Sequence, residues 1–178
     1  LTYTRYPAAG TVPAGDENYY RRVYYHKFGT KWEDDAVVWG EGRPKEEWTG
    51  VSNSSDDKYQ FLSVSLDWSK NDLYMRKAGE KEFRPVAVGL DGLFNADVLG
   101  DKLFIHTNYK APRYRIAVTS VDKPRPENWQ DVVPEHGGVQ QALALVGGKL
   151  VVQVLENACS RLLVYEPDGK LNKEITLP

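Results

Sequence analysis

The stretch DKLFIHTNYKAPRYRIAVTSVD, residues 101–122, is the key to interpreting the rest of the chain. Two runs in which apolar and polar residues alternate flank a short polar hinge that contains Pro112. Alternation with a period of two is typical of β-strands, because successive side chains point to opposite faces of a sheet. The stretch therefore predicts two strands joined by a short connection.

This pair of strands recurs along the chain at intervals of about 45 residues. GDKLFIHTN at 100–108 resembles GGKLVVQVL at 147–155, and DDKYQFLSV from residue 56 fits the same place, with Lys58, Lys102 and Lys149 as equivalents. One further strand-like run precedes each pair and another follows it. Glycine and aspartate pairs such as Gly147-Gly148 supply the tight turns that separate strands. Four-strand repeats of this length are typical of β-propeller blades.

The repeats predict an all-β chain that forms a partial β-propeller of about three and three-quarter four-stranded antiparallel blades. Full blades are expected at 48–92, 93–134 and 138–178, and residues 1–47 form a further blade that lacks its first strand. A propeller ring needs about four to eight blades, and each blade packs on its neighbours. The chain is therefore expected to be part of a ring, with open blade edges through which isolated copies would self-associate.

The composition excludes several other classes of protein. The chain has 178 residues, 41% of them hydrophobic, and a net charge of −2, which gives no electrostatic footprint for nucleic acid or an anionic membrane. Cys159 is the only cysteine, so no intrachain disulfide is possible and a reducing compartment is favoured. No apolar run approaches the length of a membrane span, and no stretch reads as a signal peptide. We expect a cytoplasmic protein, or a periplasmic one if the parent carries a signal peptide.

Six stretches, in this order along the chain, resemble the N-terminal β-propeller domain of the prolyl oligopeptidase (prolyl endopeptidase) family of serine peptidases, bacterial type. They are LTYTRYP (1–7), YRRVYYHKFGT (20–30), DWSKNDLYMRKAGEKEFRPV (67–86), LFIHTNYKAPRYRI (103–116), NWQDVVPE (128–135) and DGKLNKEITLP (168–178). The resemblance implies a seven-bladed propeller that caps an α/β-hydrolase domain carrying Ser, Asp and His. In that family the propeller admits only short peptides, which are cleaved after proline.

On this reading the chain is a gating segment without a catalytic residue, and it is expected to be inactive by itself. Its partners would be the missing blades, the α/β-hydrolase domain and short proline-containing peptides. The alternative is a stand-alone propeller that acts as a peptide- or protein-binding scaffold, because one fold supports many functions.

Two of the five tryptophans are candidates for the substrate pocket. Trp48 precedes an inner strand and Trp68 follows a second strand, so both fall near strand ends at a rim. In the resembling family, residues at these places help to wall the acyl side of the pocket. Packing between blades is the alternative. Where family members often carry a basic residue, this chain has Ser65-Leu66-Asp67. The other tryptophans, Trp32, Trp39 and Trp129, are expected to pack between blades.

No catalytic, cofactor or metal site is predicted from the remaining motifs. Ser52 in Gly50-Val51-Ser52-Asn53-Ser54 lacks the second glycine of a nucleophile elbow and is interpreted as a strand or turn serine. The three histidines are isolated in sequence, which favours neither a catalytic relay nor metal ligation. His26 and His106 are expected within strands, and Asp56-Asp57 and Asp168-Gly169 in turns. The arginines at 21, 22, 113 and 115 are expected on a solvated outer face or in contact with the missing domain.

Overall fold

Four antiparallel sheets make up the computed structural model, which describes residues 1–177. Within each sheet the strands are neighbours in chain order. The first sheet has three strands, β1 (Thr2–Arg5), β2 (Arg22–Tyr25) and β3 (Ala36–Trp39). The second sheet has four, β4 (Trp48–Asn53), β5 (Tyr59–Ser65), β6 (Asn71–Lys77) and β7 (Arg84–Ala87).

The other two sheets repeat this pattern. The third contains β8 (Phe94–Leu99), β9 (Lys102–Thr107), β10 (Arg115–Ser120) and β11 (Gln130–Val133). The fourth contains β12 (Val139–Val146), β13 (Lys149–Glu156), β14 (Cys159–Tyr165) and β15 (Leu171–Ile175). Helical structure is limited to two short 3-10 turns, Trp32–Asp34 and Pro126–Asn128. No helix within residues 1–177 has both the length and the apolar character needed to cross a bilayer.

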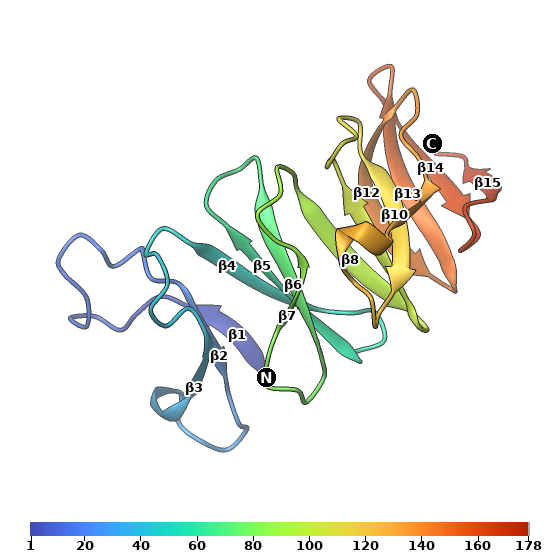
Figure 1. Cartoon of the computed structure of the whole chain (residues 1–178). Helices are drawn as coiled ribbons and strands as arrows, with labels where there is room; N and C mark the ends of the chain where they lie inside the picture. Colours follow the sequence, from blue (N-terminus) through green and yellow to red (C-terminus); the bar gives the residue numbers. More distant parts are fainter. Residues whose placement is uncertain (178) are drawn as a thin grey trace.

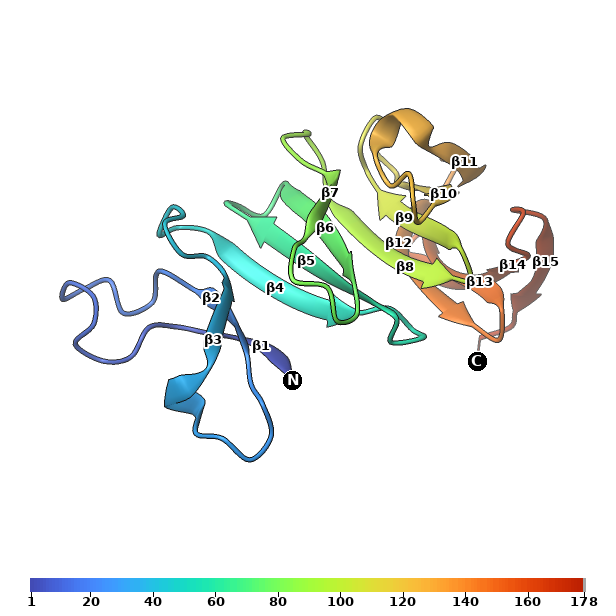
Figure 2. The same cartoon turned by 60° about the horizontal axis from the view of Figure 1, so that its bottom comes forward.

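The sheets follow one another in an arc from the N-terminus to the C-terminus, as Figure 1 shows in the order blue to red. The rotated view in Figure 2 shows the same succession. This arrangement confirms the expected all-β partial propeller, with one three-stranded and three four-stranded sheets.

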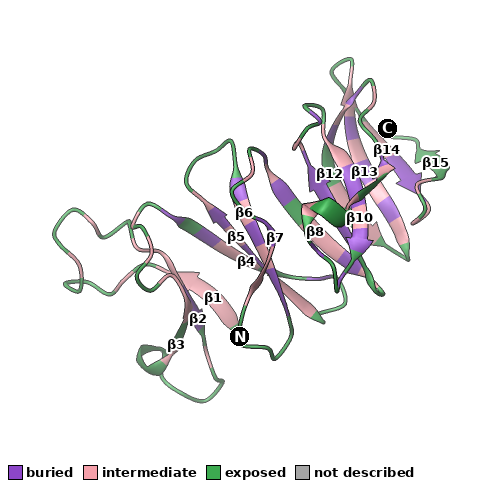
Figure 3. Cartoon of the chain, viewed as in Figure 1, coloured by how far each residue is buried: buried purple, intermediate pink, exposed green. Residues whose placement is uncertain are grey.

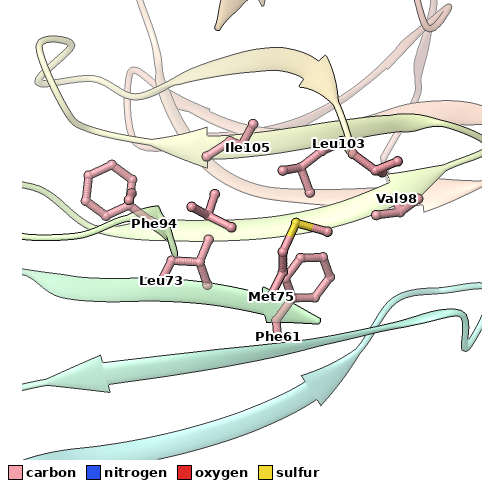
Figure 4. Close-up of a cluster of buried hydrophobic side chains, with 10 residues drawn as sticks. Phe61, Leu73, Met75, Phe94, Val98, Leu103 and Ile105 are labelled. Carbon is pink, nitrogen blue, oxygen red and sulfur yellow. The ribbon is translucent and has the colours of Figure 1, made fainter. Parts of the chain in front are cut away.

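Strands that are apolar on both faces explain why the sheets stack. All residues of β9 after Lys102 are buried. Leu103 and Ile105 pack toward the second sheet, where they meet Met75, whereas Phe104 points to the other side and packs against Val152 of the fourth sheet. Figure 4 shows the first of these clusters, with side chains from β5, β6, β8 and β9 filling the space between two sheets. Because successive side chains of a strand point to opposite faces, β9 packs against the second sheet on one face and the fourth sheet on the other.

Hairpin geometry follows the turn residues. Gly147 and Gly148 both have positive φ and join the paired residues Val146 and Lys149, which is the predicted two-residue hairpin. Gly169 turns the chain between β14 and β15 and approaches the neighbouring sheet closely. A Cβ atom placed on Gly169 would lie 2.0 Å from the carbonyl oxygen of Val132 in β11, so no side chain fits there.

The connections form two rims. We call the "tryptophan rim" the rim formed by the linkers between sheets (40–47, 88–93 and 134–138) and by the loops 6–21, 66–70, 108–114 and 157–158. The remaining hairpins form the opposite rim. In an antiparallel meander these connections fall at the same end of every sheet, which brings distant loops together.

The two ends of the arc remain uncovered. Figure 3 shows buried residues concentrated in the strands of the middle sheets, with exposed loops around them. At the N-terminal end, Arg5 of β1 lies over the ring of Trp32, which is 52% exposed. At the C-terminal end every residue of β15 is exposed. Within residues 1–177, Trp32 therefore packs against no second sheet, in contrast to the expectation from the sequence.

Candidate functional site

Trp48 and Trp68 lie side by side on the tryptophan rim. Trp48 is the first residue of β4 and pairs with Ser65, the last residue of β5. The loop after Ser65 carries Trp68, so the pairing of β4 with β5 brings the two indoles together. Their ring centroids are 6.0 Å apart and their planes are inclined by 61°. Trp48 is 54% exposed and Trp68 is 90% exposed, which makes them an open aromatic pair.

The loop that carries Trp68 is held by Asp67. Its Oδ1 accepts hydrogen bonds from the backbone N–H and the hydroxyl of Ser69, each at 2.7 Å, and from the backbone N–H of Lys70 at 3.2 Å. The hydrogen bonds from Ser69 and Lys70, together with the charge of Lys70, lower the pKa of the Asp67 carboxyl below its usual value. This aspartate turn presents the indole of Trp68 at the tip of a defined loop.

The two tryptophans wall a cavity of about 400 Å³ on this rim. Its lining comes from the loop 6–21, the second sheet with its loop 66–70, and the linkers on either side of that sheet: Arg21, Glu46, Trp48, Thr49, Gly50, Ser63, Ser65, Leu66, Asp67, Trp68 and Leu93. The volume and the aromatic walls suit a peptide side chain.

Arg21 is a lining residue that the sequence interpretation did not place here. Its Nη2 donates a hydrogen bond to Thr4 Oγ1 at 2.7 Å. The guanidinium lies between the rings of Tyr6 and Trp48, 5.8 Å and 5.6 Å from their centroids. Arg21 is therefore not on a solvated outer face. The start of β2 lies at the same rim as the start of β4, and this topological relation is the signal that could have located it.

A second hollow of about 460 Å³ adjoins the first and shares Arg21, Glu46 and Trp48 with it. The long loop 6–21 covers it. Lys45 Nζ, 2.8 Å from Asp16 Oδ1, ties this loop to the linker between the first and second sheets. The loop position therefore bears directly on access to the tryptophan pair.

No histidine forms a hydrogen bond with a serine hydroxyl within residues 1–177. His26 lies one residue beyond β2, not within it as expected, and its Nδ1 is 2.8 Å from Asp35 Oδ1. His106 lies in β9 as expected, and its Nε2 is 2.9 Å from the carbonyl oxygen of Gln140. His136 Nδ1 accepts a hydrogen bond from the backbone N–H of Gly138.

Ser52 lies in β4, which is followed by a strand and not by a helix, so the strand serine reading is confirmed. In the described part of the chain, no group of three or more His, Cys, Asp or Glu side chains could hold a metal ion. Asp56 and Asp168 accept backbone hydrogen bonds from Lys58 and Lys170 respectively, which is the turn chemistry expected of them.

Over residues 1–178 the sequence matches the family described as the prolyl oligopeptidase N-terminal beta-propeller domain. The chain belongs to this family of prolyl oligopeptidase propellers. Among curated relatives, the prolyl endopeptidases of Elizabethkingia miricola and Elizabethkingia meningoseptica are 32% and 30% identical over 177 and 174 residues. Each alignment covers 97% of this chain and 24% of the relative. The chain thus spans about a quarter of the length of these prolyl endopeptidases.

Solved structures agree with the membership of the prolyl oligopeptidase family. One structure, from a study of two prolyl endopeptidases and their inter-domain dynamics, has a TM-score of 0.91 at 28% identity and covers 99% of this chain and 26% of its own. Prolyl oligopeptidase B from Galerina marginata, bound to a 25mer macrocyclization substrate, has a TM-score of 0.85. At 23% identity, over 98% of this chain and 25% of that one, it supports the fold alone.

The other aromatic and basic candidates of this prolyl oligopeptidase propeller have structural roles. Trp39 of the first sheet packs against Tyr74 of the second, and Trp129 packs on the apolar cluster shared by the second and third sheets, so both lie between sheets as expected. Arg115 pairs with Asp131 within the third sheet. Arg113 Nη1 donates a hydrogen bond to the carbonyl oxygen of Gly137 at 2.8 Å.

Proposed function

We propose that this chain is the propeller segment that filters and contacts substrate in a serine peptidase of the prolyl oligopeptidase type, which cleaves short peptides after proline. The observation that carries the proposal is the open pair of Trp48 and Trp68 on one rim of a chain of this family. The proposal assigns the catalytic Ser, Asp and His to another part of the parent protein, since this chain spans about a quarter of the length of its prolyl endopeptidase relatives.

The tryptophan pair would grip a side chain of the peptide. An indole offers a large apolar face, and burying it costs little conformational entropy because only two torsions are fixed. Trp68 in particular has almost its whole surface available to a ligand. Such exposed aromatic anchors are the residues that typically dominate binding energy when a partner covers them.

The filtering role is supported by the way in which the sheets stack. Their interfaces are filled with apolar side chains, so a peptide has no passage between adjacent sheets of the arc. Access to the tryptophan rim is then left to openings at the loops and the ring axis. A narrow opening would admit short, flexible peptides and exclude folded proteins.

The first experiment compares this chain with the full-length protein on a fluorogenic peptide that contains proline. We expect turnover by the full-length protein and none by the 178-residue chain. Turnover by pure chain that a serine-reactive inhibitor abolishes would contradict the assignment of the catalytic residues.

The second experiment tests the tryptophans in the full-length protein. Trp48→Ala and Trp68→Ala are expected to raise KM by about 5- to 30-fold each, which corresponds to about 1–2 kcal/mol of lost contact. Phe28→Ala is the matched control, since Phe28 is 80% exposed on the opposite rim. An unchanged KM in both tryptophan variants would count against substrate contact at this rim, and binding of peptide without any hydrolysis would favour a scaffold.

A further inference from the structure

The surroundings of the tryptophan pair are acidic. Glu46 and Asp67 line the cavity itself. A neighbouring hollow of about 440 Å³ shares Leu66 with it and contributes Asp72 and Asp91. Glu47 also lines this hollow, but it is neutralised by Arg43 at 2.5 Å and is left out of the count. The other four carboxylates face two cations of the same linings, Arg21 and Lys70. The linings of these two hollows therefore carry an excess of negative charge.

The two cations of these linings are not stacked on the ring of Trp68, although the charge of Lys70 is close enough to Asp67 to help lower the pKa of its carboxyl. Arg21 is turned toward the first sheet, where it donates to Thr4 and lies between Tyr6 and Trp48. It therefore occupies one side of Trp48 only. Lys70 closes the turn of Asp67 through its backbone N–H. Neither cation lies over the ring of Trp68.

The exposed indole of Trp68 is free to contact a cation of a bound peptide. The face of an indole carries negative potential and attracts an ammonium or guanidinium group. Within residues 1–177 no lysine or arginine is stacked on Trp68, whose ring is 90% exposed, and the carboxylate of Asp67 is its sequence neighbour. An inclined pair of indoles flanked by carboxylates is the chemistry that recognises a cationic side chain.

We propose that the hollow between Trp48 and Trp68 selects a lysine or arginine side chain of the peptide, at one of the residues that precede the proline. This inference rests on the proposed function and adds the class of substrate. Asp67 and Trp68 are the specificity-determining residues. Glu46 adds to the field from the linker between the first and second sheets.

The expected preference is moderate because the site is open to solvent. A cation over an exposed indole gains about two- to five-fold in binding, and a neighbouring exposed carboxylate contributes a similar or smaller factor. Together they predict a preference of about five- to ten-fold for a charged over a neutral side chain. Added salt should reduce the carboxylate part of this preference, since it is screened.

The test compares peptides that carry lysine or acetyl-lysine, which has a similar shape but no charge, at each position before the proline. The full-length protein is expected to show a five- to ten-fold higher kcat/KM for the lysine peptide at one position. Asp67→Asn retains an acceptor for the turn and removes the charge, and Trp68→Leu removes the aromatic face. Each should bring the ratio at least half-way toward one. Asp122→Asn, on the opposite rim, makes the same charge change and should leave the ratio unaltered.

The outcomes distinguish a failure of the cation selection from a failure of the proposed function. Efficient hydrolysis of both peptides with equal kcat/KM at every position, or a ratio that Asp67→Asn and Trp68→Leu leave unchanged, overturns the selection of a cation only. Hydrolysis of neither peptide overturns the proposed function. In that event the affinities of the full-length protein for the two peptides, measured by tryptophan fluorescence, decide the inference, and equal affinities overturn it.

Discussion

The side-chain amide of Asn71 makes with Phe94 both hydrogen bonds that a neighbouring strand would make. Its Oδ1 accepts the backbone N–H of Phe94 at 2.8 Å, and its Nδ2 donates to the carbonyl oxygen of Phe94 at 3.1 Å. Asn71 begins β6 and Phe94 begins β8, so this contact joins the second sheet to the third at the tryptophan rim. Both residues are buried, and the amide supplies hydrogen-bond partners for the backbone N–H and the carbonyl oxygen of Phe94.

Asn71→Ala is therefore expected to lower the free energy of unfolding by about 2–4 kcal/mol, because two buried backbone groups lose their partner. Urea unfolding of the chain measures this, and faster hydrogen exchange of the Phe94 amide should accompany it. The control is Asn95→Ala, since Asn95 is the exposed neighbour of Phe94 in β8. Equal stability of the two variants would show that water replaces the amide at no cost.

Substitution by alanine should destabilise the chain strongly at Trp129 and hardly at all at Trp68. Trp129 packs against Phe94, and its indole N–H donates to the carbonyl oxygen of Pro124 at 2.7 Å. Trp129→Ala is expected to cost about 3 kcal/mol of stability, whereas Trp68→Ala should change stability by less than about 0.5 kcal/mol. Thermal unfolding distinguishes the two. A strongly destabilised Trp68→Ala would mean that this indole has a packing role.

Acid should destabilise the chain through His106. Burial lowers the pKa of this imidazole below its usual value of about 6.5, and the hydrogen bond with the Gln140 carbonyl opposes that effect only in part. Since the unfolded chain then binds the proton more readily, this contribution to stability is complete above about pH 6.5 and is lost as the pH falls toward the lower pKa of the folded state. The midpoint of urea unfolding between pH 7 and pH 5.5 measures the loss.

His106→Gln is the matched variant, because glutamine can also donate to the Gln140 carbonyl but does not titrate. Its stability curve should be flatter than that of the wild-type chain over the same pH interval. Parallel curves for the two proteins would assign the pH dependence to other groups.

The chain produced by itself should self-associate. At the C-terminal end, β15 is an unpaired edge whose Leu171 is half exposed, and unpaired edges are templates for further strands. Leu171→Lys should therefore reduce the apparent mass in light scattering. Leu66→Lys introduces the same charge at an exposed leucine in the loop between β5 and β6, the two inner strands of the second sheet, and should not. A monomer at high concentration, before any substitution, would contradict the expectation.

The repeat of turn residues and two-faced strands was sufficient to predict the order of the strands and the partial propeller. It could not predict positions that depend on the main chain leaving the regular pattern. Tyr114 has a φ of +66°, so the extended main chain is interrupted directly before β10 begins. The place of Arg21 in the cavity was not predicted for a related reason, because its contact with Tyr6 arises within a long loop and its contact with Trp48 joins that loop to the second sheet.

The sequence predicted the two tryptophans of the candidate site but not its acidic surroundings. The family resemblance singled out Trp48 and Trp68, and strand pairing explains their proximity. The acidic surroundings come from Glu46, Asp72 and Asp91, which are scattered along the chain and share no spacing. The meander of the second sheet brings its two flanking linkers and the start of β6 to the same end, and that information is not contained in a local pattern.

The close approach of Gly169 to the main chain of β11 leaves no room for a side chain between the third and fourth sheets at this point. In a circular assembly the splay angles must add up to one full turn. A residue larger than glycine at position 169 would act as a spacer, and the misfit could not remain local, since every other joint of the circle would have to tighten to compensate. One missing side chain thus constrains the circumference of the whole ring.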